Sequence, residues 1–134
     1  MIGRTALVDL SAASSQLQRV PFVRPERVLV VGAGGLGCPA LLALAEAGVQ
    51  RVTVVDPDRV EATNLPRQVL FRSEDVGRCK ATAAVEAVSR WYVGLRYEAR
   101  VEAFQPDASA WLDAYDVVLD ATDRWPTKLA LHDA

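Results

Sequence analysis

Short apolar runs alternate with amphipathic segments along this chain of 134 residues. Runs of β-branched and other apolar residues, bounded by turn or charged residues, predict buried strands. Four such strands are expected, at residues 27–31, 51–55, 95–101 and 116–120. A segment of strong helix formers at 38–47 lies between the first two strands, and Gly48 is placed to end that helix.

Three further helices are expected. The clearest covers about 76–92, where apolar side chains recur on one face at helical spacing. These side chains are Ala81, Ala84, Val85, Val88 and Trp91. Polar residues at 73–75 are typical of a helix start. A short helix is predicted around 107–113, and a last one begins near Pro126.

The alternation of strands and helices predicts an α/β fold. Strands joined by helical crossovers form a mostly parallel sheet, so we expect a Rossmann-like, doubly wound architecture. With the four predicted strands numbered in chain order, the expected order is 3-2-1-4, and the ligand crevice lies at their carboxyl ends. Residues 1–26 show no clear periodicity and are interpreted as an N-terminal arm, which leaves 27–134 as the domain.

The first predicted strand runs directly into the glycine-rich turn Gly32-Ala-Gly-Gly-Leu-Gly37. Gly32 permits a tight turn, Gly34 lets a phosphate approach the backbone, and Gly37 lets the helix pack close to the strand. The first amides of the following helix have no partner within it and carry partial positive charge. The turn therefore predicts a bound nucleotide; tight helix packing without a ligand is the alternative.

Asp56 ends the second predicted strand, about 20 residues beyond the turn, where an acid can accept hydrogen bonds from ribose hydroxyls. A loop or capping carboxylate is the alternative. The polar segment that follows is longer than the usual connection. Within it, the spacing of Asn64, Arg67 and Gln68 allows their polar ends to point together over the turn. Lys80 adds a point charge; solvated surface is the alternative for both cations.

Composition narrows the class of protein. Apolar residues make up 51% and charged residues 24%, with a net charge of −2, which is typical of a globular protein without a nucleic-acid footprint. Residues 28–45 carry no charge, but the glycines and Pro39 within them favour a buried strand, turn and helix over a membrane span. The N-terminus does not read as a secretory signal, so a cytoplasmic location is expected.

The chain has two cysteines, Cys38 and Cys79, and they form no Cys-x-x-Cys pair. We therefore expect no zinc site in this chain. Cys38 lies at the start of the first helix, a place where the pKa of a thiol can be lowered. A small, buried and unreactive residue is the interpretation we favour for it.

Five motifs, in this order and spacing, resemble the ThiF/MoeB/HesA family of ubiquitin-activating-enzyme-like adenylyltransferases. They are the glycine turn, Asp56-x-Asp58, Asn64-Leu-x-Arg-Gln68, Gly77-x-x-Lys80 and Asp120-Ala-Thr-Asp123. The resemblance runs from about Arg27 to Asp123. It implies ATP-dependent adenylation of the C-terminal glycine of a ubiquitin-like sulfur-carrier protein ending in Gly-Gly, in molybdopterin or thiamine synthesis.

The resemblance also implies residue roles. Asp56 would hold the ribose, Gln68 would support the loop, and Asp123 would bind Mg²⁺. Arg67, Lys80 and Asp123 would be the catalytic residues, acting by positioning and charge neutralisation. The residues expected to bind ATP are Gly32, Gly34, Gly35, Gly37, Asp56, Asn64, Arg67, Gln68 and Lys80.

Two departures from the family pattern matter. Family members continue well beyond the length of this chain, so the fold is expected to be truncated relative to them, and a homodimer would cover its unfinished surface. After Asp123 the family usually has asparagine, whereas this chain has Arg124. The alternatives are a non-catalytic nucleotide-binding or dimerisation module of the same fold and an NAD-dependent oxidoreductase, which would leave Asn64 to Gln68 unexplained.

Overall fold

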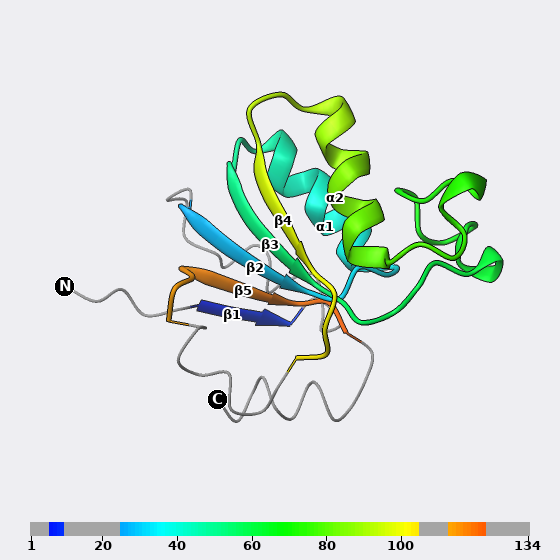
Figure 1. The fold of residues 1–134 in the computed structure, drawn as a ribbon. Coiled ribbons are helices and arrows are strands. Elements are labelled where there is room, and N and C mark those ends of the chain that lie inside the picture. Colours follow the sequence, from blue (N-terminus) through cyan, green and yellow to red (C-terminus); the bar gives the residue numbers. More distant parts are fainter. Residues whose placement is uncertain (1–5, 10–24, 105–112, 123–134) are drawn as a thin grey trace.

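The computed structural model describes residues 6–9, 25–104 and 113–122 (Figure 1). Its five strands form one parallel sheet in the order β1-β5-β2-β3-β4. They are β1 (Ala6–Asp9), β2 (Arg27–Val31), β3 (Arg51–Val55), β4 (Arg96–Arg100) and β5 (Val117–Asp120). Read from β4, the four predicted strands lie in the predicted order 3-2-1-4, so the α/β fold class and the parallel sheet are confirmed.

The strand β1 was not predicted. It lies in the segment interpreted as an N-terminal arm and adds a parallel edge strand beside β5, with Ala6 opposite Val117. Four residues are too few to show a period, and the pairing is made with a strand more than a hundred positions away. The helices expected around 107–113 and from Pro126 fall mainly on residues 105–112 and 123–134, outside the described part of the chain.

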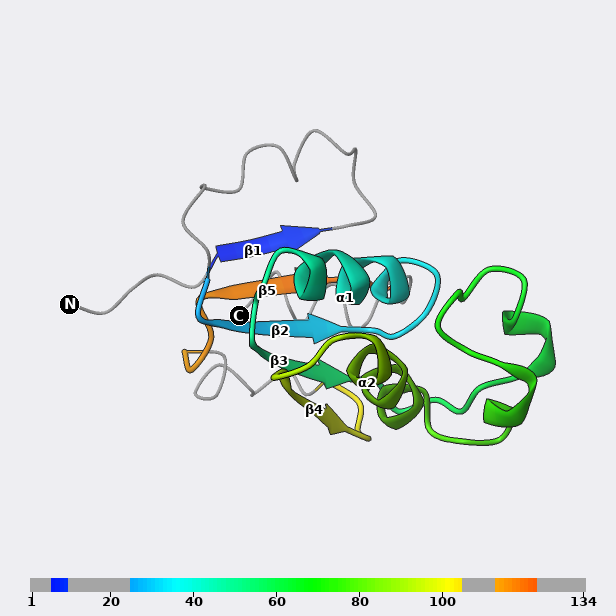
Figure 2. The ribbon, with the colours of Figure 1, turned by 90° about the horizontal axis from the view of Figure 1, so that it is seen from above.

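Two α-helices, α1 (Gly37–Glu46) and α2 (Lys80–Trp91), cover one face of the sheet (Figure 2). Alternate side chains of β2 and β3 pack against them, and the intervening ones pack on the opposite face with Phe104. After its first residue, each of these two strands is therefore buried on both faces, which explains its continuous apolar run. The predicted end of α1 at Gly48 is confirmed, with the glycine at φ +82°.

The predicted limits and face of the second helix need correction. Residues 73–75 form a separate 3-10 helix, and Gly77 has φ +90°, so α2 begins at Lys80 rather than at 76. Trp91 was predicted on the apolar face with the core residues. It is 77% exposed, because it is the last residue of α2 and lies beyond the part of the helix that contacts the sheet.

The turn between β2 and α1 is packed as the glycine pattern predicts. Gly32 has φ +103°, a conformation that side chains rarely adopt. A Cβ on Gly37 would lie 2.0 Å from the carbonyl oxygen of Gly32, so only glycine lets the helix start this close to the turn. This close approach directs the N-terminus of α1 toward the carboxyl ends of the strands.

A long loop between β3 and α2 projects beyond the carboxyl edge of the sheet (Figure 1). Its two ends are fastened together by backbone hydrogen bonds. The amide of Val60 donates to Arg78 O at 2.8 Å, and the amide of Gly77 donates to Val60 O at 2.8 Å. The amide of Lys80 donates to Asp58 O at 2.9 Å, so the start of α2 is tied to the end of β3.

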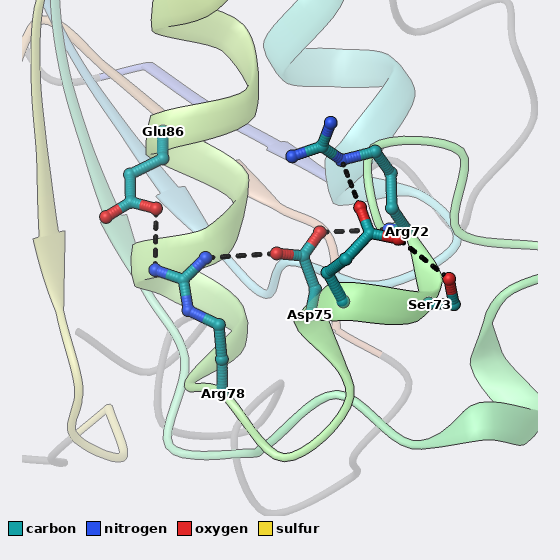
Figure 3. Close-up of polar contacts among 6 residues, drawn as sticks. Arg72, Ser73, Asp75, Arg78 and Glu86 are labelled. Atoms are coloured by element: carbon teal, nitrogen blue, oxygen red, sulfur yellow. Dashed lines mark hydrogen bonds and ion pairs between the residues drawn. The ribbon is translucent and has the colours of Figure 1, made fainter.

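A small polar network orders the second half of this loop (Figure 3). Asp75 is 2% exposed, and its carboxylate accepts hydrogen bonds from the amide of Arg72 at 2.9 Å and from the guanidinium of Arg78 at 3.0 Å. The same guanidinium donates to Glu86 on α2 at 2.6 Å. Arg78 therefore bridges the loop and the helix that carries Lys80.

We expect Gly37→Ala to lower the free energy of unfolding by about 3 kcal/mol, because its Cβ has no room beside the Gly32 carbonyl. Gly35→Ala is the matched control, since an added Cβ there meets no atom within 4 Å. Urea unfolding of the two variants measures the difference. Equal stabilities would contradict the close packing of the turn.

We expect Asp75→Ala to lower the free energy of unfolding by about 2 kcal/mol, because a buried carboxylate with two hydrogen bonds is lost. Glu74→Ala removes the same charge from the neighbouring position, where the side chain is 69% exposed, and should have little effect. Thermal or urea unfolding compares them. A Glu74 variant as unstable as the Asp75 variant would show that charge, and not burial, decides the effect.

Candidate nucleotide-binding site

A cavity of about 480 Å³ lies at the carboxyl ends of β2, β3 and β5. Seven of the residues predicted to bind a nucleotide line it: Gly32, Gly34, Gly35, Asp56, Arg67, Gln68 and Lys80. They come from the glycine turn, the end of β3, the long loop and the first turn of α2. The two cations therefore lie on the same cavity as the glycine turn, as the sequence predicts. Its volume falls in the usual range for small-molecule sites.

Gly35 and Leu36 of the turn line this cavity and have free backbone donors. Among the described residues, the amides of Gly35, Leu36 and Gly37 have no hydrogen-bond acceptor. The N-terminus of α1 has no side-chain cap and no acidic residue in its first turn. Its partial positive charge has no counterpart within the helix and, with Arg67 and Lys80, makes one side of the cavity suited to phosphate.

The opposite lining of the cavity is apolar. It is formed by Val31, Val55, Ala103 and Phe104, which belong to or adjoin the smaller core cluster on the sheet face away from the helices. A cavity with cations and free amides on one side and apolar side chains on the other can hold a ligand that is itself part charged and part apolar. A nucleotide has this division.

Asp56 is 6% exposed and holds the glycine turn in place. Its carboxylate accepts hydrogen bonds from the amide of Ala33 at 2.8 Å and from the amide of Asp58 at 2.7 Å. Burial raises the pKa of the Asp56 carboxyl, and the two amide donors oppose that rise. Asp56 therefore acts as a structural loop carboxylate, which was the alternative interpretation of this residue. Each oxygen can accept a further hydrogen bond and Asp56 lines the cavity, so ribose binding stays a prediction.

Asn64 organises the loop through hydrogen bonds of its side chain and its backbone carbonyl. It is 8% exposed, and its side-chain oxygen accepts a hydrogen bond from the amide of Glu61 at 2.8 Å. Its backbone carbonyl accepts from the amides of Arg67 at 3.0 Å and Gln68 at 2.9 Å. Like Gly37, it is not among the described residues that line the cavity, so its contact with a triphosphate also stays a prediction.

Gln68 lines the cavity and has a buried side-chain oxygen without a hydrogen-bond partner. The residue is 5% exposed, and no described group donates a hydrogen bond to its Oε1. Its Nε2 would lie 3.3 Å from a Cβ placed on Gly34, so the amide closes over the turn. A buried acceptor without a donor costs about 1–3 kcal/mol, and this oxygen is enclosed by the protein rather than exposed to the cavity.

Cys38 is fully buried and donates a long hydrogen bond, of 3.5 Å, to Ala33 O. Burial raises the pKa of its thiol to about 11, the opposite of the lowering that a helix start can produce. Cys38 is therefore a packing residue. In the part of the chain that the structure describes, no three His, Cys, Asp or Glu side chains are grouped to hold a metal, and Asp123 lies outside that part.

Several lining residues were given no role in the sequence analysis. Among them are Phe104 and Thr122, from the segment after β4 and the segment after β5. Thr122 is fixed by Asp120, a fully buried residue whose Oδ1 accepts from the Thr122 amide at 3.1 Å and hydroxyl at 2.7 Å. The spacing Asp-x-Thr is a local signal for this turn. Phe104 has no comparable signal.

No described helix is long and apolar enough to cross a membrane. The chain is similar to several known proteins. Adenylyltransferase and sulfurtransferase uba4 of Aspergillus niger is 40% identical over 132 residues, which are 98% of this chain and 27% of that protein. Sulfur carrier protein adenylyltransferase of Thermus thermophilus is 48% identical over 108 residues, which are 80% of this chain and 40% of that protein.

Solved structures agree with the sequence relatives. The crystal structure of Escherichia coli tRNA N6-threonylcarbamoyladenosine dehydratase, TcdA, in complex with ATP has a TM-score of 0.73 and 33% identity, and the match covers 79% of this chain and 44% of that one. The chain thus spans less than half the length of each of these proteins. The family model described as the ThiF family matches residues 13–134. With that match over most of its length, the chain belongs to the ThiF family.

Proposed function

We propose that this chain is the nucleotide-binding part of an enzyme that uses ATP to adenylate the C-terminal glycine of a ubiquitin-like sulfur-carrier protein. One observation carries the proposal: Arg67, Lys80 and the glycine turn, with its free amides at Gly35 and Leu36, line a single cavity. The names of the relatives support the reaction, and the ATP complex of TcdA supports the nucleotide.

ATP suits the residues that line the cavity. Its triphosphate would occupy the side with the free amides, Arg67 and Lys80, and its ribose would face Asp56. Gln68 lines the same cavity beside the glycine turn, where it would support the loop around the bound nucleotide. Mg²⁺, held by Asp123, would neutralise further phosphate charge.

The proposed reaction needs no covalent bond to the protein. The terminal carboxylate of the carrier attacks the α-phosphorus, the bond to the bridging oxygen breaks, and pyrophosphate leaves with the electron pair. The chain's own part is to hold the reactants in line and to stabilise the charge that builds up on the phosphates. Arg67 contributes a planar fork of donors, and Lys80 contributes a compact point charge.

The finer assignments belong to the same proposal. The carrier would end in Gly-Gly and serve molybdopterin or thiamine synthesis, in the cytoplasm. The chain would form a homodimer. A non-catalytic module of the same fold remains the second hypothesis, and it differs in one respect: it binds ATP without activating a carboxylate.

We expect Arg67→Ala and Lys80→Ala each to reduce ATP–pyrophosphate exchange about 100-fold or more, because each removes a cation from the phosphate side of the cavity. The assay contains ATP, Mg²⁺, labelled pyrophosphate and a carrier ending in Gly-Gly. Arg72→Ala is the matched control: it removes an arginine of the same loop whose side chain is 56% exposed and does not line the cavity.

Calorimetry with ATP separates the remaining outcomes. Binding without exchange in the unmodified chain would identify the non-catalytic module. Absence of ATP binding at millimolar nucleotide would contradict the proposal altogether. An Arg72 variant that loses as much exchange as the Arg67 variant would show that general charge near the loop, and not the cavity, governs the reaction.

A further inference from the structure

Three arginines stand side by side at the opposite end of the sheet from the cavity. Arg27, Arg51 and Arg96 are the first residues of β2, β3 and β4, and the strands pair with these residues in register. The residues that follow them, including Val28 and Val52, pack in the core beneath the helices. Because side chains alternate along a strand, the three arginines lie on the sheet face away from α1 and α2.

This arginine row (Arg27, Arg51 and Arg96) borders a cleft of about 240 Å³. Polar groups complete the lining. Thr53 is 7% exposed and receives a hydrogen bond of 2.9 Å from the hydroxyl of Tyr115, which also lines the cleft. The arginines therefore surround a concave space with a buried hydroxyl at its back.

Within the described residues, no carboxylate lies within ion-pair distance of any of the three guanidinium groups. Two other arginines, Arg72 and Arg78, do form ion pairs. Neighbouring strands lie about 4.8 Å apart, so like charges in register repel one another and destabilise the sheet.

Nearby carboxylates do not cancel this charge. Glu98 lines the cleft one step further along β4, which leaves three guanidinium groups against one carboxylate. Asp116 lies close to the start of β2, where its Oδ2 accepts hydrogen bonds from the amides of Glu26 at 2.8 Å and Arg27 at 3.1 Å, so its negative charge offsets part of the charge of Arg27. Among the residues that line the cleft, positive charge is still in excess.

We propose that the arginine row binds a small, multivalent oxyanion of the class of a short phosphate chain. A planar guanidinium matches the geometry of phosphate oxygens, and three in a row span about 10 Å, which suits several linked phosphates. The cleft is small and the net charge of the chain is −2, so an extended polyanion such as nucleic acid is disfavoured. This site is separate from the cavity that carries the proposed function.

Calorimetry with sodium tripolyphosphate tests the proposal. The titration uses Lys80→Ala as the background, to weaken binding of the probe in the main cavity. Adding Arg51→Gln, which removes the central member of the row, should weaken the affinity at least tenfold. Arg90→Gln is the control for charge, because Arg90 is an exposed arginine on α2 and does not line the cleft. It should change the affinity less than twofold.

A stability measurement supplies an independent readout. At low ionic strength, Arg51→Gln should raise the melting temperature by relieving repulsion, and tripolyphosphate should raise that of the Lys80→Ala background but not that of the double variant. Arg51→Lys, which keeps the charge without the planar fork, should retain part of the affinity.

Three results would overturn the proposal: no tripolyphosphate binding at millimolar concentration, equal losses for Arg51→Gln and Arg90→Gln, or tighter binding of a thymidine oligonucleotide than of tripolyphosphate. The outcome is independent of adenylation. Exchange activity should persist in Arg51→Gln with Lys80 intact, and loss of the anion site would leave the ATP hypothesis standing.

Discussion

The rest of the site depends on how closely α1 starts behind the glycine turn. The backbone at Gly37 lies so near the Gly32 carbonyl that no side chain fits between them. This contact sets the direction of the helix axis, and with it the direction of three amides that have no acceptor within the described chain. Asp56 secures the same turn from the end of β3 through the amide of Ala33. Steric contact and one buried carboxylate thus fix the turn that carries these amides.

Local patterns in the sequence were sufficient for most of the fold. The runs that became β2, β3 and β5 are apolar because both faces of each strand are covered, and such runs can be recognised without knowledge of their neighbours. The strand β1 could not be recognised in this way, because its place depends on pairing with β5. The start of α2 was misjudged because capping signals at 73–75 serve a 3-10 helix instead.

The candidate site shows the same division between local and tertiary information. Spacing indicated that Asn64, Arg67 and Gln68 could point together over the turn, and the family resemblance added Lys80. Arg67, Gln68 and Lys80 line the cavity with the turn. Spacing could not show that the side-chain oxygen of Asn64 accepts a hydrogen bond from the loop backbone, or that the Asp56 carboxylate accepts from two backbone amides. Phe104 reaches the cavity through the path of the chain after β4, which no short pattern encodes.

The fastening of the long loop at both ends has a consequence for the thermodynamics of recognition. An unanchored loop of this kind loses conformational entropy when a ligand orders it, and that loss subtracts from affinity. Here the loop is ordered during folding. An antiparallel bridge between Arg59 and Cys79 and the flanking backbone hydrogen bonds hold its two ends together. Ligand binding then carries a smaller entropic penalty, because the charged groups of the loop are already in place before the ligand binds.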